Sequence, residues 1–134
     1  MSGRICQLGR RFSRCISVSI ESCQYCGRNF CSVHAYYIRD HDAVCNRRRC
    51  LEKWDDLVAH NQYKAGVEAR NRAGLCGMAG CGPHPRAECS LCQGHFCSDH
   101  LRPHMYPMFN GYSTVDRPVS VCSRCWDRRK LWRH

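Results

Sequence analysis

The chain has 134 residues, enough for one or two small domains, and 14 of them are cysteine. A domain of this size buries too little apolar surface to be stable by core packing alone, so we expect disulfides or metal ions to stabilise it. The formal charge of +10 indicates a basic protein, but this sum counts every cysteine as neutral, and cysteines bound to metal would be negatively charged thiolates. Net charge alone therefore does not indicate nucleic-acid binding.

The N-terminal sequence MSGRICQLGRRFSRC lacks the apolar stretch of a secretory signal. No apolar run approaches the roughly 20 residues of a membrane span. We therefore expect an intracellular protein, cytoplasmic or nuclear, whose thiols stay reduced. Spacing also favours metal over disulfides, because Cys-x2-Cys and Cys-x2-His are typical of zinc ligands.

A twelve-residue unit occurs twice in the chain. Residues 23–34 read CQYCGRNFCSVH and residues 89–100 read CSLCQGHFCSDH, with six identical positions that include the three cysteines and the histidine. Each copy extends to four ligand pairs, and sixteen ligands predict four tetrahedral structural zinc sites. The predicted ligands are Cys6, Cys15, Cys23, Cys26, Cys31, His34, Cys45 and Cys50 in the first copy, and Cys76, Cys81, Cys89, Cys92, Cys97, His100, Cys122 and Cys125 in the second.

The ligands of one copy can share two ions sequentially or in interleaved pairs. Only four residues separate Cys26 from Cys31, and with Gly27 among them they predict a tight hairpin. A hairpin places the pairs before and after it on different sides, which favours interleaving. The expected groups are Cys6, Cys15, Cys31, His34; Cys23, Cys26, Cys45, Cys50; Cys76, Cys81, Cys97, His100; and Cys89, Cys92, Cys122, Cys125.

The segment between the copies predicts a helix. Leu51, Trp54, Leu57 and Val58 form a helical apolar stripe, and Gly74 is a plausible stop. The predicted organisation is a first two-zinc domain at 1–50, a linker helix at 51–74, and a second two-zinc domain at 75–134 with a C-terminal helix.

The second copy carries an aromatic segment, residues 104–118, that the first copy lacks. A long loop of this kind is either functional or a larger zinc-stabilised excursion. Two tryptophans also lie on the short terminal helix. The candidates for a protein interface are Met105, Tyr106, Phe109, Tyr112 and Trp132.

The motifs CGMAGC and ECSLCQGHFCSDH resemble the AN1-type zinc finger, with Phe30 and Phe96 in its aromatic position. The ending RPVSVCSRCWD resembles the last ligand pair of a FYVE-type finger. Together these resemblances imply a small zinc-stabilised α+β fold, with two tandem cross-brace, treble-clef-like domains joined by a helix. The usual AN1 tail is altered, and His41 or His104 is an alternative ligand. No basic cluster precedes Cys23 or Cys89, so phosphoinositide membrane binding is not expected.

No catalytic constellation is evident, because the predicted zinc sites use every cysteine and leave no coordination position open. We expect a non-enzymatic adaptor or complex subunit that binds protein partners; the AN1 resemblance implies a link to ubiquitin. One alternative is an RNA- or DNA-binding protein, and another is a RING-like ubiquitin-ligase component. The nucleic-acid candidates are Arg10, Arg11, Arg14, Arg47, Arg48, Arg49, Arg128, Arg129, Lys130 and Arg133, although the same side chains could instead offset thiolate charge.

Overall fold

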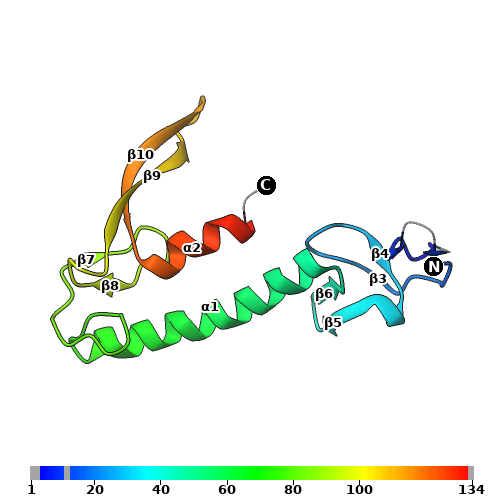
Figure 1. Ribbon diagram of the computed structural model, residues 1–134, viewed down its shortest axis with the longest axis horizontal. Coiled ribbons are helices and arrows are strands. Elements are labelled where there is room, and N and C mark those ends of the chain that lie inside the picture. Colours follow the sequence, from blue (N-terminus) through cyan, green and yellow to red (C-terminus); the bar gives the residue numbers. More distant parts are fainter. Residues whose placement is uncertain (1–3, 11–12, 133–134) are drawn as a thin grey trace. The chain divides into compact units, whose positions relative to one another are not determined.

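The computed structural model describes residues 4–10 and 13–132 and divides into two compact units, Met1–Val58 and Ala59–His134. It is a small α+β structure with two α-helices and, in its described part, five two-stranded antiparallel sheets (Figure 1). The elements are β1 (Gly9–Arg10), β2 (Ser13–Arg14), β3 (Glu21–Ser22), β4 (Asn29–Phe30), η1 (Ser32–His34), β5 (Ala35–Arg39), β6 (Asp42–Cys45), α1 (Arg48–Arg72), β7 (Ala87–Glu88), β8 (His95–Phe96), β9 (Arg102–Phe109), β10 (Thr114–Val121) and α2 (Ser123–Trp132).

The first unit is built from short hairpins around a small core. Strands β1 and β2, β3 and β4, and β5 and β6 pair with one another, and Ile5 forms an isolated bridge with Val18. Phe30 and Val44 are fully buried among the cysteine side chains. With so few apolar side chains inside, core packing contributes little, and the cysteines form most of the interior.

Helix α1 begins at Arg48, within the last ligand pair of the first copy, and ends at Arg72, where the sequence predicted a helix over 51–74. Its C-terminus is a Schellman motif: the Gly74 N–H donates to the Asn71 carbonyl and the Leu75 N–H donates to the Arg70 carbonyl, each at 3.0 Å. Gly74 has φ +78°, the left-handed conformation that this cap requires. The two compact units divide after Val58, inside the helix.

The buried side of α1 changes along its length. In the first unit Trp54 stacks on Tyr37, with ring centroids 4.4 Å apart, whereas Val58 is exposed. In the second unit Tyr63 and Val67 pack against the core. Because these two residues are four positions apart, they share one helical face.

The second unit contains β7–β8, the long β9–β10 hairpin and α2. Its core includes the fully buried Phe96 and Val121. The segment expected as a loop over 104–118 is largely a regular hairpin, closed by residues 110–113. At the tip, the Asn110 side chain accepts hydrogen bonds from the Tyr112 and Ser113 amides, both at 3.0 Å.

Three prolines lie in these two strands, although proline cannot donate a hydrogen bond to a strand ladder. Pro103 pairs with Ser120, Pro107 with Asp116, and Pro118 with Met105. All three pairs belong to the same alternate set in the register, and in one such set the N–H groups point away from the partner strand. The prolines therefore lose no ladder hydrogen bond, and they leave fewer donors on the outer edges.

No helix in the described part of the chain combines the length and the apolar character needed to cross a membrane.

Candidate metal centres

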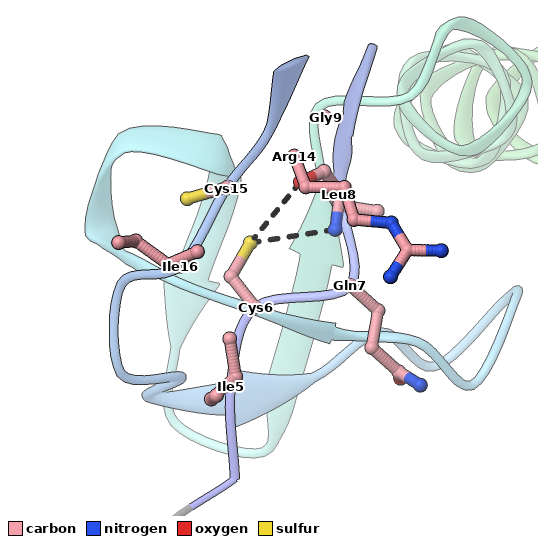
Figure 2. Close-up of a pocket in the computed structure, with 8 residues that line it drawn as sticks. All are labelled: Ile5, Cys6, Gln7, Leu8, Gly9, Arg14, Cys15 and Ile16. Atoms are coloured by element: carbon pink, nitrogen blue, oxygen red, sulfur yellow. Dashed lines mark hydrogen bonds between the residues drawn. The ribbon is translucent and has the colours of Figure 1, made fainter. Parts of the chain in front are cut away.

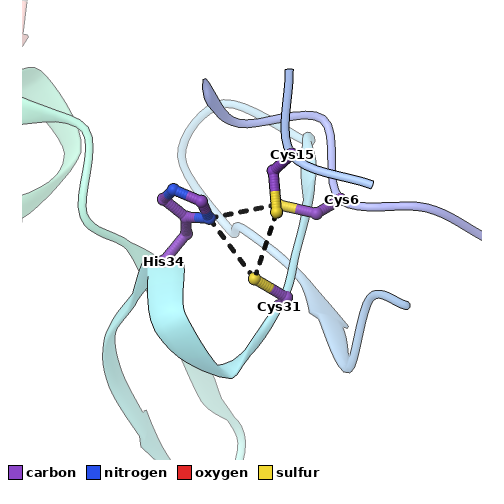
Figure 3. A group of neighbouring side chains, drawn as sticks. All are labelled: Cys6, Cys15, Cys31 and His34. Atoms are coloured by element: carbon purple, nitrogen blue, oxygen red, sulfur yellow. Dashed lines mark hydrogen bonds between the residues drawn. The ribbon is translucent and has the colours of Figure 1, made fainter. Parts of the chain in front are cut away.

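Cys6, Cys15, Cys31 and His34 lie together in the first unit (Figure 3). Cys15 follows β2, Cys31 precedes the 3₁₀ helix η1, and His34 is the last residue of that helix. The His34 Nδ1 atom is 3.5 Å from the Cys6 sulfur and 3.3 Å from the Cys31 sulfur, and the Cys15 and Cys31 sulfurs are 3.7 Å apart.

These distances fit a tetrahedral zinc ion. A Zn–S bond of about 2.3 Å gives a tetrahedral S–S edge of about 3.8 Å, and a Zn–N bond near 2.05 Å shortens the S–N edge to about 3.6 Å. A disulfide would bring two sulfurs to about 2.05 Å. All fourteen cysteines are free, so the spacing of the sulfurs matches metal ligands and not disulfides.

The second group of the first unit is Cys23, Cys26, Cys45 and Cys50. Cys23 follows β3, Cys45 ends β6, and Cys50 lies in the first turn of α1. The Cys26 and Cys45 sulfurs are 3.8 Å apart, again one tetrahedral edge. Cys50 thus makes the start of α1 part of this centre.

The second unit repeats both arrangements. One group is Cys76, Cys81, Cys97 and His100, where the His100 Nδ1 atom is 3.5 Å from the Cys76 sulfur and 3.2 Å from the Cys97 sulfur. The other group places Cys122 just before α2 and Cys125 within it: Cys89, Cys92, Cys122, Cys125. The structure thus brings the sixteen predicted ligands into four groups, in the interleaved order that the sequence favoured.

Equivalent tight turns hold the central Cys-x2-Cys of each copy. The Gly27 N–H donates to the Cys23 carbonyl at 2.8 Å, and the Gln93 N–H donates to the Cys89 carbonyl at 2.9 Å. Both turn residues have positive φ, +74° for Gly27 and +62° for Gln93. Glycine takes this conformation without strain, whereas glutamine takes it at a cost in backbone strain. In the second copy the turn that holds the ligands requires this conformation of Gln93.

Amide donors make several of these sulfurs good thiolates. Burial raises the pKa of the Cys23 thiol, but backbone N–H groups of Cys45, Cys26 and Tyr25 outweigh it and lower the pKa to about 7. At Cys31 burial is likewise outweighed, chiefly by the hydrogen bond with His34, and the pKa falls to about 6. Zinc binds the deprotonated sulfur, so these donors favour metal binding.

Tyr63, on α1, contacts the fourth centre directly. Its hydroxyl donates to the Cys122 sulfur at 3.3 Å, and burial together with this thiolate raises the tyrosine pKa. Donors to ligating sulfurs orient the ligand and tune its charge. Sequence analysis missed this residue, although its i, i+4 spacing with Val67 marks a helical face.

Two further α1 residues clamp the backbone around the third centre. Arg70 donates through Nε to the Cys76 carbonyl at 2.8 Å and through Nη2 to the Cys81 carbonyl. Asn71 pairs with the His95 backbone through both polar atoms of its side-chain amide: Oδ1 accepts from the His95 N–H at 2.9 Å, and Nδ2 donates to the His95 carbonyl at 2.8 Å. The second half of α1 is therefore part of the second zinc unit.

Close packing at two glycines accompanies this clamp. A Cβ atom at Gly94 would lie 2.6 Å from Val67 Cγ1, and one at Gly77 would lie 2.8 Å from the same atom. Both distances are shorter than any normal contact between carbon atoms. Gly77 and Gly94 therefore form the notch that accepts Val67. In the first copy, Gln7 and Arg28 occupy the equivalent positions.

Several predicted nucleic-acid contacts are engaged within the protein. A hydrogen bond with Cys26 raises the Arg47 pKa, so this guanidinium lies beside a zinc ligand. Arg48 pairs with Glu52 at 3.0 Å. Arg128 lies over the Trp132 ring and Arg129 over the Trp126 ring, whereas Lys130 is exposed. Arg49 also has a partner, and Arg14 is exposed. Arg11, Arg133 and the side chain of Arg10 lie outside the described residues.

The predicted interface residues lie mainly on the hairpin. Met105, Phe109 and Tyr112 are exposed, Tyr106 is half-buried, and Trp132 is half-buried on α2. The alternative ligands lie elsewhere: His41 is exposed in the β5–β6 turn, and the His104 ring stacks on Trp126 with centroids 3.8 Å apart. Neither histidine belongs to a metal-ligand group among the described residues.

The four groups of four ligands are consistent with four zinc ions per chain, with all the cysteines reduced. Comparisons with protein-family models, curated proteins and solved structures find no match to this chain.

Proposed function

We propose that this protein is a non-enzymatic, four-zinc scaffold that binds protein partners, as an adaptor or as a subunit of a larger complex. In this proposal each copy is a cross-brace, treble-clef-like domain resembling AN1 fingers, because its first and third ligand pairs share one ion and its second and fourth pairs share the other. Each ion has four protein ligands, so no position is open for a substrate or a catalytic water. The zinc ions then have a structural role: they fix the positions of the chain segments that lie between the ligands.

The β9–β10 hairpin carries the proposal. An isolated two-stranded hairpin is marginally stable in water, and this one is anchored near its base, where His104 stacks on Trp126 and Val121 is buried. Beyond that anchor the hairpin exposes several large apolar side chains: Phe109 is 73% exposed and Tyr112 is 95% exposed. Met105, Met108 and Val115 extend this surface along the strands. Aromatic residues and methionine are enriched in protein interfaces, so a partner protein is the natural cover for it.

The binding mode follows from the prolines. Because Pro103, Pro107 and Pro118 remove donors from the outer edges, the hairpin is a poor template for an added strand. Its faces and its tip are therefore the contact surface, with Phe109 and Tyr112 as anchors.

The test compares copurifying proteins in the native organism. Full-length tagged protein is compared with a Phe109→Ser, Tyr112→Ser double variant and with Val33→Ser, a control at an exposed aliphatic residue of the first unit. We expect the double variant alone to lose a specific set of partners in quantitative mass spectrometry while keeping four zinc ions. Equal recovery with all three proteins would refute the hairpin as the interface.

Nucleic-acid binding is the second candidate, favoured by the exposed Lys130 beside Arg128 and Arg129 on α2. Both arginines lie over tryptophan rings, and these cation–π contacts explain the positions of their side chains without a nucleic-acid ligand. Binding of single-stranded RNA with an affinity that falls steeply with salt would support this candidate over the scaffold proposal. The RING-like alternative requires faster discharge of ubiquitin from a conjugating enzyme when the protein is added.

A further inference from the structure

A pocket of about 770 Å³ opens in the first unit beside its first metal centre (Figure 2). Its lining includes Ile5, Leu8, Ile16 and Arg14, around the ligands Cys6 and Cys15. A second pocket of about 330 Å³ shares Leu8 and Gly9 with the first and adds Arg28, His34 and Arg47. The two pockets form one surface, which we call the basic-aliphatic surface.

The aliphatic side of this surface is unusually exposed. Ile5 is 53% exposed and Ile16 is 82% exposed. Ile5 pairs with Val18 in an antiparallel bridge, which places these two side chains on the same face, and Val18 is 62% exposed. A row of exposed aliphatic side chains beside a pocket is typical of an interaction site.

The polar side carries positive charge. Arg14 and Arg28 are exposed, and neither has an ion-pair partner among the described residues. No described lining residue of either pocket is an aspartate or a glutamate. The chemistry that complements this surface is therefore an aliphatic side chain flanked by carboxylates, since guanidinium groups bind carboxylates with paired hydrogen bonds.

The internal repeat shows what kind of segment fits here. In the second unit the equivalent surface is covered by α1: Val67 sits on Gly77 and Gly94, and Arg70 reaches the carbonyls of Cys76 and Cys81. In the first copy, Gln7 and Arg28 correspond to Gly77 and Gly94, and Cys6 and Cys15 correspond to Cys76 and Cys81. All four first-copy residues line the two pockets. A helix thus covers in the second copy the place that is an open surface in the first.

We infer that the basic-aliphatic surface binds an acidic helix of a partner protein, which inserts an aliphatic side chain between Ile5 and Ile16 and places carboxylates against Arg14 and Arg28. The inference rests on the proposed protein-interaction role and adds a second, chemically defined contact to it. A nucleic acid fits less well, because the described lining of both pockets holds no phenylalanine, tyrosine or tryptophan, and its one aromatic ring is the imidazole of the predicted zinc ligand His34.

The test selects binding peptides on the zinc-loaded full chain from a displayed library of 16-residue helical peptides. The enriched peptides are then titrated by fluorescence anisotropy against the wild type, Ile16→Asp and Arg28→Glu. We expect acidic peptides with an aliphatic residue, and binding weakened about tenfold or more by either substitution, equivalent to 1.4 kcal/mol. Val33→Asp and Arg39→Glu, exposed residues of the same unit outside both pockets, should leave binding unchanged.

Each other outcome overturns the inference in a distinguishable way. Peptides released only by Phe109→Ser, Tyr112→Ser would support the hairpin interface while overturning this one, and a failure to enrich any peptide would count against both. Binding of a single-stranded RNA that depends on Arg14 and Arg28 would reassign the surface to nucleic acid. Self-association that Ile16→Asp abolishes would make the occupant a second copy of the chain. Native mass spectrometry showing four zinc ions in every variant excludes unfolding as the cause.

Discussion

The notch that accepts Val67 gives a stability prediction in which sign and size follow from distances. In Gly94→Ala the new Cβ would lie 2.6 Å from Val67 Cγ1 and 3.1 Å from Phe96 Cε2. Val67 is 4% exposed and Phe96 is fully buried, so the new methyl group would meet two side chains that already pack against the core. Overpacking of this kind costs about 1–3 kcal/mol.

Gly66→Ala is the matched control, because it adds the same methyl group to α1 where no atom lies within 4 Å. Mid-helix alanine is favoured over glycine by about 1 kcal/mol, so this variant should be more stable than the wild type. In a domain of roughly this size 1 kcal/mol shifts the melting temperature by about 4–8 °C. The two substitutions should therefore move the melting of the second unit in opposite directions.

Hydrogen exchange, measured by mass spectrometry on individual peptides of the zinc-loaded protein, shows in which unit each substitution changes the stability. A double-mutant cycle with Val67→Ala tests the cause, because removing Cγ1 removes the closest contact. Gly94→Ala should cost less in that background than in the wild type. If Gly94→Ala is as stable as the wild type, or costs the same in both backgrounds, the packing account of this notch is wrong.

Three further predictions concern the metal centres. Native mass spectrometry should find four zinc ions per chain, and a chelator should unfold both units, because structural zinc contributes about 10–16 kcal/mol per site in small fingers; zero metal with seven disulfides would contradict this. Cys26→Ser and Cys92→Ser should each unfold only their own copy, which hydrogen exchange would locate; unchanged zinc content and melting would count against the ligand assignment. Tyr63→Phe removes the donor to the Cys122 sulfur and should destabilise the second unit by about 1.5–3 kcal/mol, with faster zinc release to a chromogenic chelator from that unit; an unchanged release rate would show that the hydroxyl has no role at the metal.

The parts of the structure that the sequence predicted are those that zinc chemistry constrains. A tetrahedral centre needs four ligands, and the short link between Cys26 and Cys31 limits how pairs can combine. The helix was also predictable, because Trp54 marks its apolar side and Gly74 its end.

The parts it missed depend on contacts between residues far apart in sequence. The stripe of 51–58 does not continue along α1, since the buried side of the second half is set by the notch of Gly77 and Gly94, which no local pattern reveals. The hairpin was missed because Pro107 and Pro118 argue against strands when taken singly. They are compatible with strands only in a register that places both in the same alternate set, and that register is a property of the pair of strands.

The two copies show how identical metal centres can support different surfaces. The backbone amide of residue 29 and that of residue 95 are equivalent, and each donates to a side-chain oxygen at 2.9 Å: Asn29 to Gln7 of its own unit's N-terminal segment, His95 to Asn71 of helix α1. One copy thus pairs this amide with a side chain of its own N-terminal segment, whereas the other pairs it with a helix side chain. Because zinc supplies most of the folding free energy of such small units, neither solution is required for the metal geometry. The metal geometry of the first copy therefore does not require its basic-aliphatic surface to be covered by the chain itself. A partner helix at this surface would account for the exposed positions of Ile16 and Arg28.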